Sequence, residues 1–357
     1  MTLPKLMSGV LLTGHGGRDK LQWSDDIPVP NPGPGQVLVR VLAAGVNNTD
    51  INTRLGWYAR EVTGATDQAT GEGVQAGGWD GALSFPRIQG GDLCGAVVAL
   101  GDGVTTTKIG RRVTAPLCLP RPSLANPVGI EVLGSERDGA FAQYCLLEEG
   151  DLCDVTASPL TDVEIAAIPC AYGTAEGMLT RAGITSGQTV LITGASGGVG
   201  MAAVELATLR GARVTAMTSA AKAEAVRAAG AARTLDRDAT LPDDGFDAAI
   251  DVVGGPGFAS LITATRPGGH IAFAGAIAGP MAGIDLRDVY LRDITLHGCT
   301  FQAPEIFARL VALINAGGLK PLVSHSYPLA EIARAQEDFQ SKAYPGKLVL
   351  IPPGADR

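Results

Sequence analysis

The stretch Gly194-Ala195-Ser196-Gly197-Gly198-Val199-Gly200 decides the fold of this chain. It follows an apolar, strand-like run at residues 189–193 and opens a helical pattern at residues 201–209. A strand that passes through a glycine turn into a helix N-terminus can bind a dinucleotide pyrophosphate, because small residues let the backbone approach it and the free N–H groups favour its charge. An ordinary tight turn is the alternative. We expect phosphate contacts from Ser196, Gly197, Gly198 and Val199.

The length and composition of the chain limit its class. It has 357 residues, which suggests two domains, and its 46% hydrophobic and 18% charged residues indicate a globular protein. The net charge of −8 argues against nucleic acid as a partner. No apolar run approaches the roughly 20 residues that span a bilayer, and no signal peptide is evident. We therefore expect a cytoplasmic protein without a membrane partner, whose six cysteines are reduced thiols.

Two regions with different patterns follow one another along the chain. Up to about residue 155, short strand-like runs alternate with Gly and Pro, which indicates a barrel-like or irregular β fold. From about residue 160, strands alternate with helices, which predicts a doubly wound parallel sheet. We expect the C-terminal tail to return to the first domain. The predicted helices lie at 161–182, 201–209, 220–229, 303–316 and 329–342, and strands lie at 36–41, 95–100, 112–115, 189–193, 212–217, 246–253, 270–274, 294–296 and 347–351.

Residues 59–85 have no clear periodicity and are rich in Gly, Ala and Thr. A loop of this length inside a compact domain is usually functional or mobile. We expect it to form a lid or wall over an active site, and a surface excursion without a catalytic role is the alternative.

The residues at the end of the strand after the glycine turn discriminate between NAD(H) and NADP(H). A ribose 2′-hydroxyl would call for Asp or Glu at this point, but the chain has Thr218, Ser219 and Lys222. Hydroxyls and a cation suit a 2′-phosphate, so we expect NADP(H) rather than NAD(H). The carboxyl ends of parallel strands line the cofactor crevice. Further cofactor contacts are therefore expected from Val253, Gly275, Cys299 and Phe301, together with Thr174.

Six runs of sequence carry a family resemblance that covers nearly the whole chain. They lie at residues 32–40, 44–50, 86–92, 138–144, 194–200 and 346–350. With them the chain resembles the medium-chain dehydrogenase/reductase superfamily, and within it the zinc-free quinone oxidoreductase (zeta-crystallin-like) branch. The resemblance implies an α/β protein with a GroES-like β-rich catalytic domain at 1–157 and 299–357. It also implies a Rossmann domain at 158–298, NAD(P)H chemistry and a homodimer.

The resemblance also bears on a metal. The zinc enzymes of this superfamily hold zinc with a cysteine, a histidine and a second cysteine or an acid. Here Asn47 stands at the first position, Gly91 at the histidine position with Asp92 after it, and Cys170 at the third. Since a catalytic zinc needs about three protein ligands, we expect no metal. Cys170 would then be a small buried residue beside the nicotinamide.

Without a Lewis acid, the substrate must delocalise its own developing negative charge, as quinones and α,β-unsaturated carbonyls do. The resemblance points to Asn47 and Tyr58 as groups that hold the substrate oxygen, and to Thr49 as a proton relay. We expect an NADPH-dependent reductase of quinones or activated C=C bonds, with the proton from Tyr58 or water. Two alternatives stay open: a zinc-free carbonyl or alcohol oxidoreductase that uses Thr49 and Tyr58, and a non-catalytic NADPH-binding sensor or structural protein.

Overall fold

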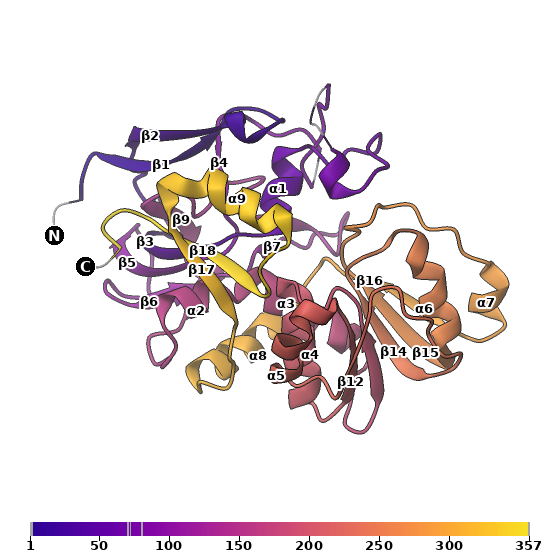
Figure 1. The fold of residues 1–357 in the computed structure, drawn as a ribbon. Helices are drawn as coiled ribbons and strands as arrows, with labels where there is room; N and C mark the ends of the chain where they lie inside the picture. The colour runs from indigo at the N-terminus through magenta and orange to yellow at the C-terminus, as the bar shows by residue number, and fades with distance from the viewer. Residues whose placement is uncertain (1–2, 70, 72, 80, 356–357) are drawn as a thin grey trace. The chain divides into compact units, whose positions relative to one another are not determined.

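A computed structural model describes residues 3–69, 71, 73–79 and 81–355, which fold into two compact units (Figure 1). The β-rich unit contains Met1–Arg60, Thr70–Cys170 and Ala303–Arg357, and the parallel-sheet unit contains Glu61–Ala69 and Ala171–Gln302. The domain boundaries after residues 157 and 298 stay a prediction, since the units change over after residues 170 and 302.

The β-rich unit is built around a seven-stranded sheet in the order β10-β6-β5-β3-β18-β17, with β9 also paired to β3. A three-stranded sheet, β2-β1-β4, and the pair β7-β8 complete it. Its strands are β1 (Leu6–Leu12), β2 (Leu21–Pro28), β3 (Gln36–Gly45), β4 (Arg87–Ile88), β5 (Cys94–Leu100), β6 (Arg112–Thr114), β7 (Cys118–Pro120), β8 (Ile130–Val132), β9 (Tyr144–Glu148), β10 (Cys153–Asp154), β17 (Val323–Pro328) and β18 (Lys347–Ile351). Its helices are α1 (Asn48–Arg54), α2 (Asp162–Ala166), α8 (Pro304–Asn315) and α9 (Ile332–Ser341).

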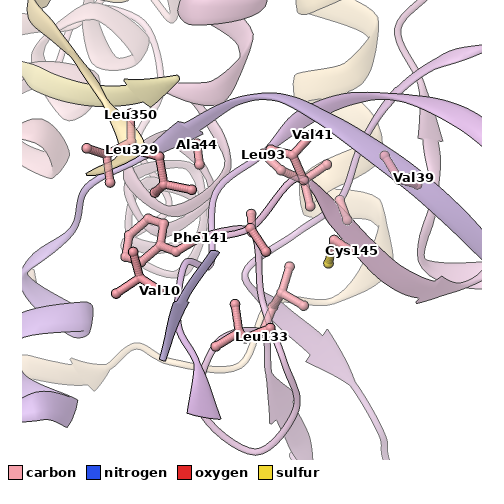
Figure 2. Close-up of a cluster of buried hydrophobic side chains, with 14 of the residues drawn as sticks. Val10, Val39, Val41, Ala44, Leu93, Leu133, Phe141, Cys145, Leu329 and Leu350 are labelled. Atoms are coloured by element: carbon pink, nitrogen blue, oxygen red, sulfur yellow. The ribbon is translucent and has the colours of Figure 1, made fainter. Parts of the chain in front are cut away.

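One hydrophobic cluster forms the core of this unit (Figure 2). Strand β3 contributes Val39 and Val41, which are at most 1% exposed, and the C-terminal tail contributes Leu329 and Leu350. Burying such side chains stabilises the fold by about 1.5–3 kcal/mol each. The core thus joins segments from both ends of the chain, and the tail returns to the first unit as the sequence predicts.

The return of the tail brings two distant residues to one place. Strand β18 pairs antiparallel with β3, with Val349 opposite Gly45, and the Val46 N–H donates to the Leu348 carbonyl at 2.9 Å. As a result Lys347, the first residue of β18, lies at the end of β3, where the chain turns into α1.

The parallel-sheet unit contains six strands, all parallel, in the order β13-β12-β11-β14-β15-β16. This is the doubly wound order of dinucleotide-binding sheets, as predicted. Helices α4, α5 and α6 of this unit contact its strands (Figure 1). The strands are β11 (Thr189–Ile192), β12 (Arg213–Met217), β13 (Arg233–Leu235), β14 (Phe246–Asp251), β15 (Thr265–Phe273) and β16 (Thr295–Gly298), and the helices are α3 (Pro169–Arg181), α4 (Gly198–Leu209), α5 (Ala223–Ala228), α6 (Phe258–Ala264) and α7 (Leu286–Tyr290).

Two predicted segments differ from the structure. The helix predicted over 161–182 is two helices, α2 and α3, separated just before Pro169. Proline has no backbone N–H and disfavours helical geometry in the residue before it, so α3 starts anew there. The unpatterned loop at 59–85 is divided between the units, because Glu61–Ala69 belongs to the parallel-sheet unit, where the Thr66 N–H donates to the Ile277 carbonyl at 3.4 Å. Its role as a lid or wall stays a prediction.

Over the part of the chain that the structure describes, no helix combines the length and the apolar character of a membrane span.

Candidate active site

The start of helix α1 places Asn47 in the interior of the β-rich unit. Asn47 is the N-cap residue, and its backbone N–H donates to Oδ2 of Asp50 at 2.8 Å. A carboxyl at the third helical position that caps the preceding N–H is half of a capping box. Gln89 Nε2 in turn donates to the Asp50 carbonyl at 2.9 Å. Asn47 and Asp50 are each 5% exposed, so both the backbone and the cap are buried.

A buried lysine lies against Asn47. Lys347 Nζ donates to Asn47 Oδ1 at 2.5 Å, to Asp92 Oδ2 at 2.9 Å and to the Val46 carbonyl at 3.0 Å. The side chains of Lys347 and Asp92 are 4% and 0% exposed. The other carboxylate oxygen of Asp92 accepts from the Cys170 N–H at 2.7 Å. The three donors of the cation are therefore all used, and each oxygen of its carboxylate partner accepts a hydrogen bond from the protein.

Several polar atoms near this pair have no partner. Asn47 Nδ2, Thr49 Oγ1 and Trp79 Nε1 are buried atoms without a hydrogen bond. Leaving a buried donor unpaired costs about 1–3 kcal/mol, so such atoms in a native protein call for an explanation. Each of the three groups can donate a hydrogen bond to a ligand.

Tyr58 lies beside an apolar wall. Its ring centroid is 4.8 Å from that of Trp79 and 5.6 Å from that of Trp57. Trp79 packs against a small apolar cluster that consists of Leu117, Cys118, Val132 and Cys170. Burial raises the pKa of the Tyr58 phenol well above its usual range, and a hydrogen bond with Asn52 opposes this only in part. The phenol therefore stays protonated at neutral pH and can act as a donor.

Cys170 connects Tyr58 electrostatically with the Lys347–Asp92 pair. Burial, and after it the charge of Asp92, raises the pKa of the Cys170 thiol well above its usual range, while Lys347 lowers it. A charge on Cys170 would in turn raise the pKa of Tyr58. The three sites thus lie within Coulombic reach of one another, and Cys170 is a neutral thiol. Its expected place beside a nicotinamide stays a prediction.

Asp50 is a buried titratable group of this site. Burial raises the pKa of its carboxyl to about 7. The hydrogen bond from the Asn47 N–H opposes this shift, Asp92 adds to it, and Lys347 opposes it.

The residues at the zinc-ligand positions do not fit a zinc ion. Gly91 carries no ligand, and a Cβ placed on it would lie 1.9 Å from Leu117 Cδ1. Both carboxylate oxygens of Asp92 are engaged, one of them by a cation, which leaves the Cys170 thiol as the one uncommitted ligand at these three positions. Among the described residues, no group of three or more His, Cys, Asp or Glu could hold a metal ion.

The glycine turn of the parallel-sheet unit has the geometry that a pyrophosphate site needs. Gly194 has a φ of 56°, and a Cβ on Gly200 would lie 2.3 Å from the Gly194 carbonyl oxygen, so side chains are excluded at both ends of the turn. Around Gly197 the nearest atom to such a Cβ is 3.5 Å away. Helix α4 starts at Gly198, and the N–H groups of its first turn are available to an anion. Ser196, Gly197, Gly198 and Val199 form this turn, and their contacts with a phosphate stay predictions.

The groups predicted to select the nucleotide lie after strand β12. Thr218 is 3% exposed, and its Oγ1 has no hydrogen-bond partner. Ser219 caps the short helical turn Ala220–Lys222, and its side chain makes no capping bond there. A buried hydroxyl without a partner at this strand end fits a bound ribose or its phosphate.

The remaining predicted cofactor residues also lie in the parallel-sheet unit. Asp251 at the end of β14 accepts from the N–H groups of Val253 and Gly254 at 3.1 and 2.9 Å, which shapes the following turn. Gly275 follows β15 with a φ of 112°, and the Cys299 N–H donates to the Phe273 carbonyl at 3.0 Å. Arg181 donates to the Phe301 carbonyl, and Thr174 is a half-buried residue of α3. Their contacts with a cofactor stay predictions.

Sequence reasoning did not assign roles to Lys347, Asp50 or Trp79. Gly346 and Lys347 entered only as part of a family motif, and Lys347 as the first residue of a strand. The burial of Lys347 arises from the pairing of β18 with β3, which no local pattern reveals.

Two family models match most of the chain. Residues 33–157 match the model described as alcohol dehydrogenase GroES-like domain, and residues 198–316 match the model described as zinc-binding dehydrogenase. The predicted fold class, a GroES-like domain with a Rossmann domain, is confirmed by these matches together with the parallel sheet.

Individual proteins match over almost their whole length. A protein of known structure from Sinorhizobium meliloti 1021, assigned as an alcohol dehydrogenase, is 42% identical, with a TM-score of 0.86 and 98% of both chains covered. The quinone oxidoreductase of Lama guanicoe is 26% identical over 97% of this chain and 98% of its own. The acryloyl-coenzyme A reductase of Metallosphaera sedula is 27% identical over 96% of this chain and 99% of its own.

The named reductases and dehydrogenases among these matches support an oxidoreductase. The dehydrogenase family model, together with NAD-dependent relatives of known structure, supports a nicotinamide cofactor. The chain belongs to the medium-chain dehydrogenase/reductase superfamily, in its quinone oxidoreductase-like branch.

Proposed function

We propose that this protein is an NADPH-dependent reductase of quinones or activated C=C bonds that works without zinc. The observation that carries the proposal is the Lys347 ammonium, which lies between Asp92 and Asn47 where a metal would need free ligands. What remains at the site is a set of neutral hydrogen-bond donors beside an apolar wall.

The donors decide which substrates are suitable. When bound, the nicotinamide cofactor supplies a hydride. The substrate oxygen then gains negative charge, which Asn47 Nδ2 and the Tyr58 phenol stabilise by hydrogen bonds. Conjugated carbonyls and quinones spread this charge over several atoms, so hydrogen bonds suffice for them. A saturated ketone concentrates it on one oxygen and gains more from a Lewis acid.

Tyr58 is the proposed proton donor. Its raised pKa keeps the phenolic proton in place at neutral pH. Proton transfer from its Oη to the reduced substrate leaves a buried phenolate, which then takes a proton from solvent. Water is the alternative donor.

The preference for NADPH rests on the strand end after β12. The unpartnered Thr218 hydroxyl, the Ser219 hydroxyl and the cationic side chain of Lys222 support binding of a 2′-phosphate, and residues 217–223 contain no Asp or Glu that would repel it.

A second candidate is a zinc-free carbonyl or alcohol oxidoreductase. It is favoured by the buried Thr49 Oγ1, which has no partner and could relay a proton. The relative from Sinorhizobium meliloti, assigned as an alcohol dehydrogenase, points the same way.

The test is a spectrophotometric screen of purified protein for oxidation of NADPH and NADH with quinones, enones, enals and their saturated analogues. Metal analysis and a parallel series after treatment with a strong chelator belong to the same experiment. We expect turnover of conjugated substrates with NADPH, unaffected by the chelator. Turnover of saturated ketones alone would favour the second candidate. Stoichiometric zinc whose removal abolishes turnover would overturn the zinc-free proposal.

We also propose a homodimer formed at strand β16. This strand ends the order of the described six-stranded sheet, and Leu286, Tyr290 and Leu291 shortly before it are 62–70% exposed. A sheet edge next to exposed apolar side chains favours self-association. Analytical ultracentrifugation should give a dimer that Tyr290→Lys with Leu291→Lys converts to monomers, and a monomeric wild type would refute the proposal.

A further inference from the structure

Lys347 uses its whole hydrogen-bonding capacity inside the protein. An ammonium group has three donors and no acceptor, and Nζ has three partners: the Val46 carbonyl, Asn47 Oδ1 and Asp92 Oδ2. No donor is left for a substrate, and the side chain is 4% exposed. Any effect of Lys347 on a bound substrate therefore has to pass through one of these partners.

Contact with the Lys347 ammonium determines which end of the Asn47 side-chain amide, the oxygen or the NH₂ group, faces the lysine. The two ends of an asparagine amide have nearly the same shape, and their assignment follows from their hydrogen bonds. An ammonium only donates, so the amide atom 2.5 Å from Lys347 Nζ has to be the oxygen. The NH₂ end then points away from Lys347.

The rest of Asn47 is already engaged. Its backbone N–H is bound by Asp50, and the N–H of the preceding Val46 is bound by the Leu348 carbonyl. The side-chain Nδ2 is buried without a partner. The protein therefore engages the side-chain oxygen and the backbone N–H of Asn47, and it leaves without a partner the Nδ2 donor that a substrate oxygen would use.

The cation also strengthens this donor. A positive charge on the amide oxygen draws electron density from the amide nitrogen, because hydrogen-bonded groups polarise one another. The charge of Lys347 thus reaches the substrate through one amide group, and Asp92 holds the ammonium in place from the other side.

We propose that Lys347 is a positioning residue that holds Asn47 Oδ1 and presents Nδ2 as a polarised donor to the oxygen of the bound carbonyl substrate. This inference rests on the proposed function, which assigns Asn47 to that oxygen.

The rival explanation is a purely structural ion pair between Lys347 and Asp92. Lys347→Met alone does not separate the two, since it leaves the Asp92 carboxylate buried and unpaired. The double variant Lys347→Met/Asp92→Asn removes both charges and keeps Asn47. Lys347→Arg is the conservative companion, and Lys108→Met removes a charge from an exposed position of the same unit as a control.

Two measurements are combined. For the folded double variant Lys347→Met/Asp92→Asn, we expect kcat with an enone to be roughly 10²-fold lower than for the wild type, which is the cost of losing one oxyanion donor. KM should change little. Asn47→Ala should cause a similar loss, and Asn47→Ala added to the double variant should cause no further loss. In ¹H–¹⁵N spectra, the Asn47 side-chain amide signal, assigned by its absence in Asn47→Ala, should move in the double variant but not in Lys108→Met.

An amide signal that stays in place in the folded double variant, together with unchanged kcat, would overturn the positioning role. Additive losses in the triple variant would overturn it as well. Failure of the proposed function looks different: the wild type would reduce no conjugated substrate, while the amide signal still reports whether Lys347 holds Asn47.

Discussion

Lys347 Nζ lies 2.9 Å from Asp92 Oδ2, and the two residues are 255 positions apart in the sequence and almost fully buried. One comes from the start of the last strand, the other from the segment before β5. The pair ties the C-terminal tail to the residues that surround Asn47.

Removing one partner should be far more damaging than removing both. Lys347→Met is expected to lower the free energy of unfolding by about 3–5 kcal/mol, because it leaves a buried carboxylate without a counter-charge. Lys347→Met/Asp92→Asn should recover much of that loss. Urea unfolding followed by circular dichroism measures both, and a single variant as stable as the wild type would refute the importance of the pair.

Asp50 should make the stability depend on pH. Its folded pKa of about 7 lies above the usual aspartate value of 3.8, so the folded state holds the proton more tightly than the unfolded chain does. The resulting stabilisation is complete below about pH 4 and is lost as the pH rises through about 7, by roughly 4 kcal/mol in all. Asp92 and Lys347 face the same carboxyl and oppose each other in this shift.

Asp50→Asn removes this titration and keeps an oxygen that can accept the Asn47 N–H. Between pH 4 and pH 7 the wild type should therefore lose stability that Asp50→Asn does not lose. The difference in the free energy of unfolding, variant minus wild type, should increase with pH over this range. Asp102→Asn, at an exposed position, serves as the control. Parallel curves for Asp50→Asn and wild type over this range would contradict the assignment.

The parallel-sheet unit follows from local patterns in the sequence. Each of its first elements depends on neighbouring residues: the strand that ends at Ile192, the turn from Gly194 to Gly200 and the helix after it. The period of hydrophobic residues and the glycine spacing are therefore sufficient to predict them. Asn47 and Tyr58 could be nominated because they stand at matching positions of a family pattern.

The electrostatics of the site could not be predicted in the same way. A lysine at the start of a strand is normally exposed, and the burial of Lys347 depends on a strand pairing over some 300 residues of chain. The raised pKa of Asp50 likewise comes from burial that only the folded unit produces. The loop at 59–85 had no period to interpret, so neither its division at Ala69 nor the packing of Trp79 was foreseeable.

Loss of the phenol should affect turnover more than binding. Tyr58→Phe keeps the ring against Trp79 and removes the donor, so kcat with an enone should fall about 10²-fold, as for a lost general acid, with KM nearly unchanged. Tyr344→Phe, at a position that is 37% exposed, should leave both constants as they are. Full activity of Tyr58→Phe in steady-state assays would remove this residue from the mechanism.

Lys222 should determine the preference for NADPH over NADH. A hydrogen bond to a charged group contributes about 1.5–3 kcal/mol, so Lys222→Ala should lower kcat/KM for NADPH roughly 10- to 100-fold. The value for NADH should hardly change, because NADH has no 2′-phosphate to lose contact with. Ser219→Asp should go further and favour NADH, since the acid repels the phosphate and can bind the free 2′-hydroxyl. Both variants are compared with Lys108→Ala, an exposed lysine of the β-rich unit. Equal losses for the two cofactors in Lys222→Ala would mean that its side chain supports the fold rather than reading the phosphate.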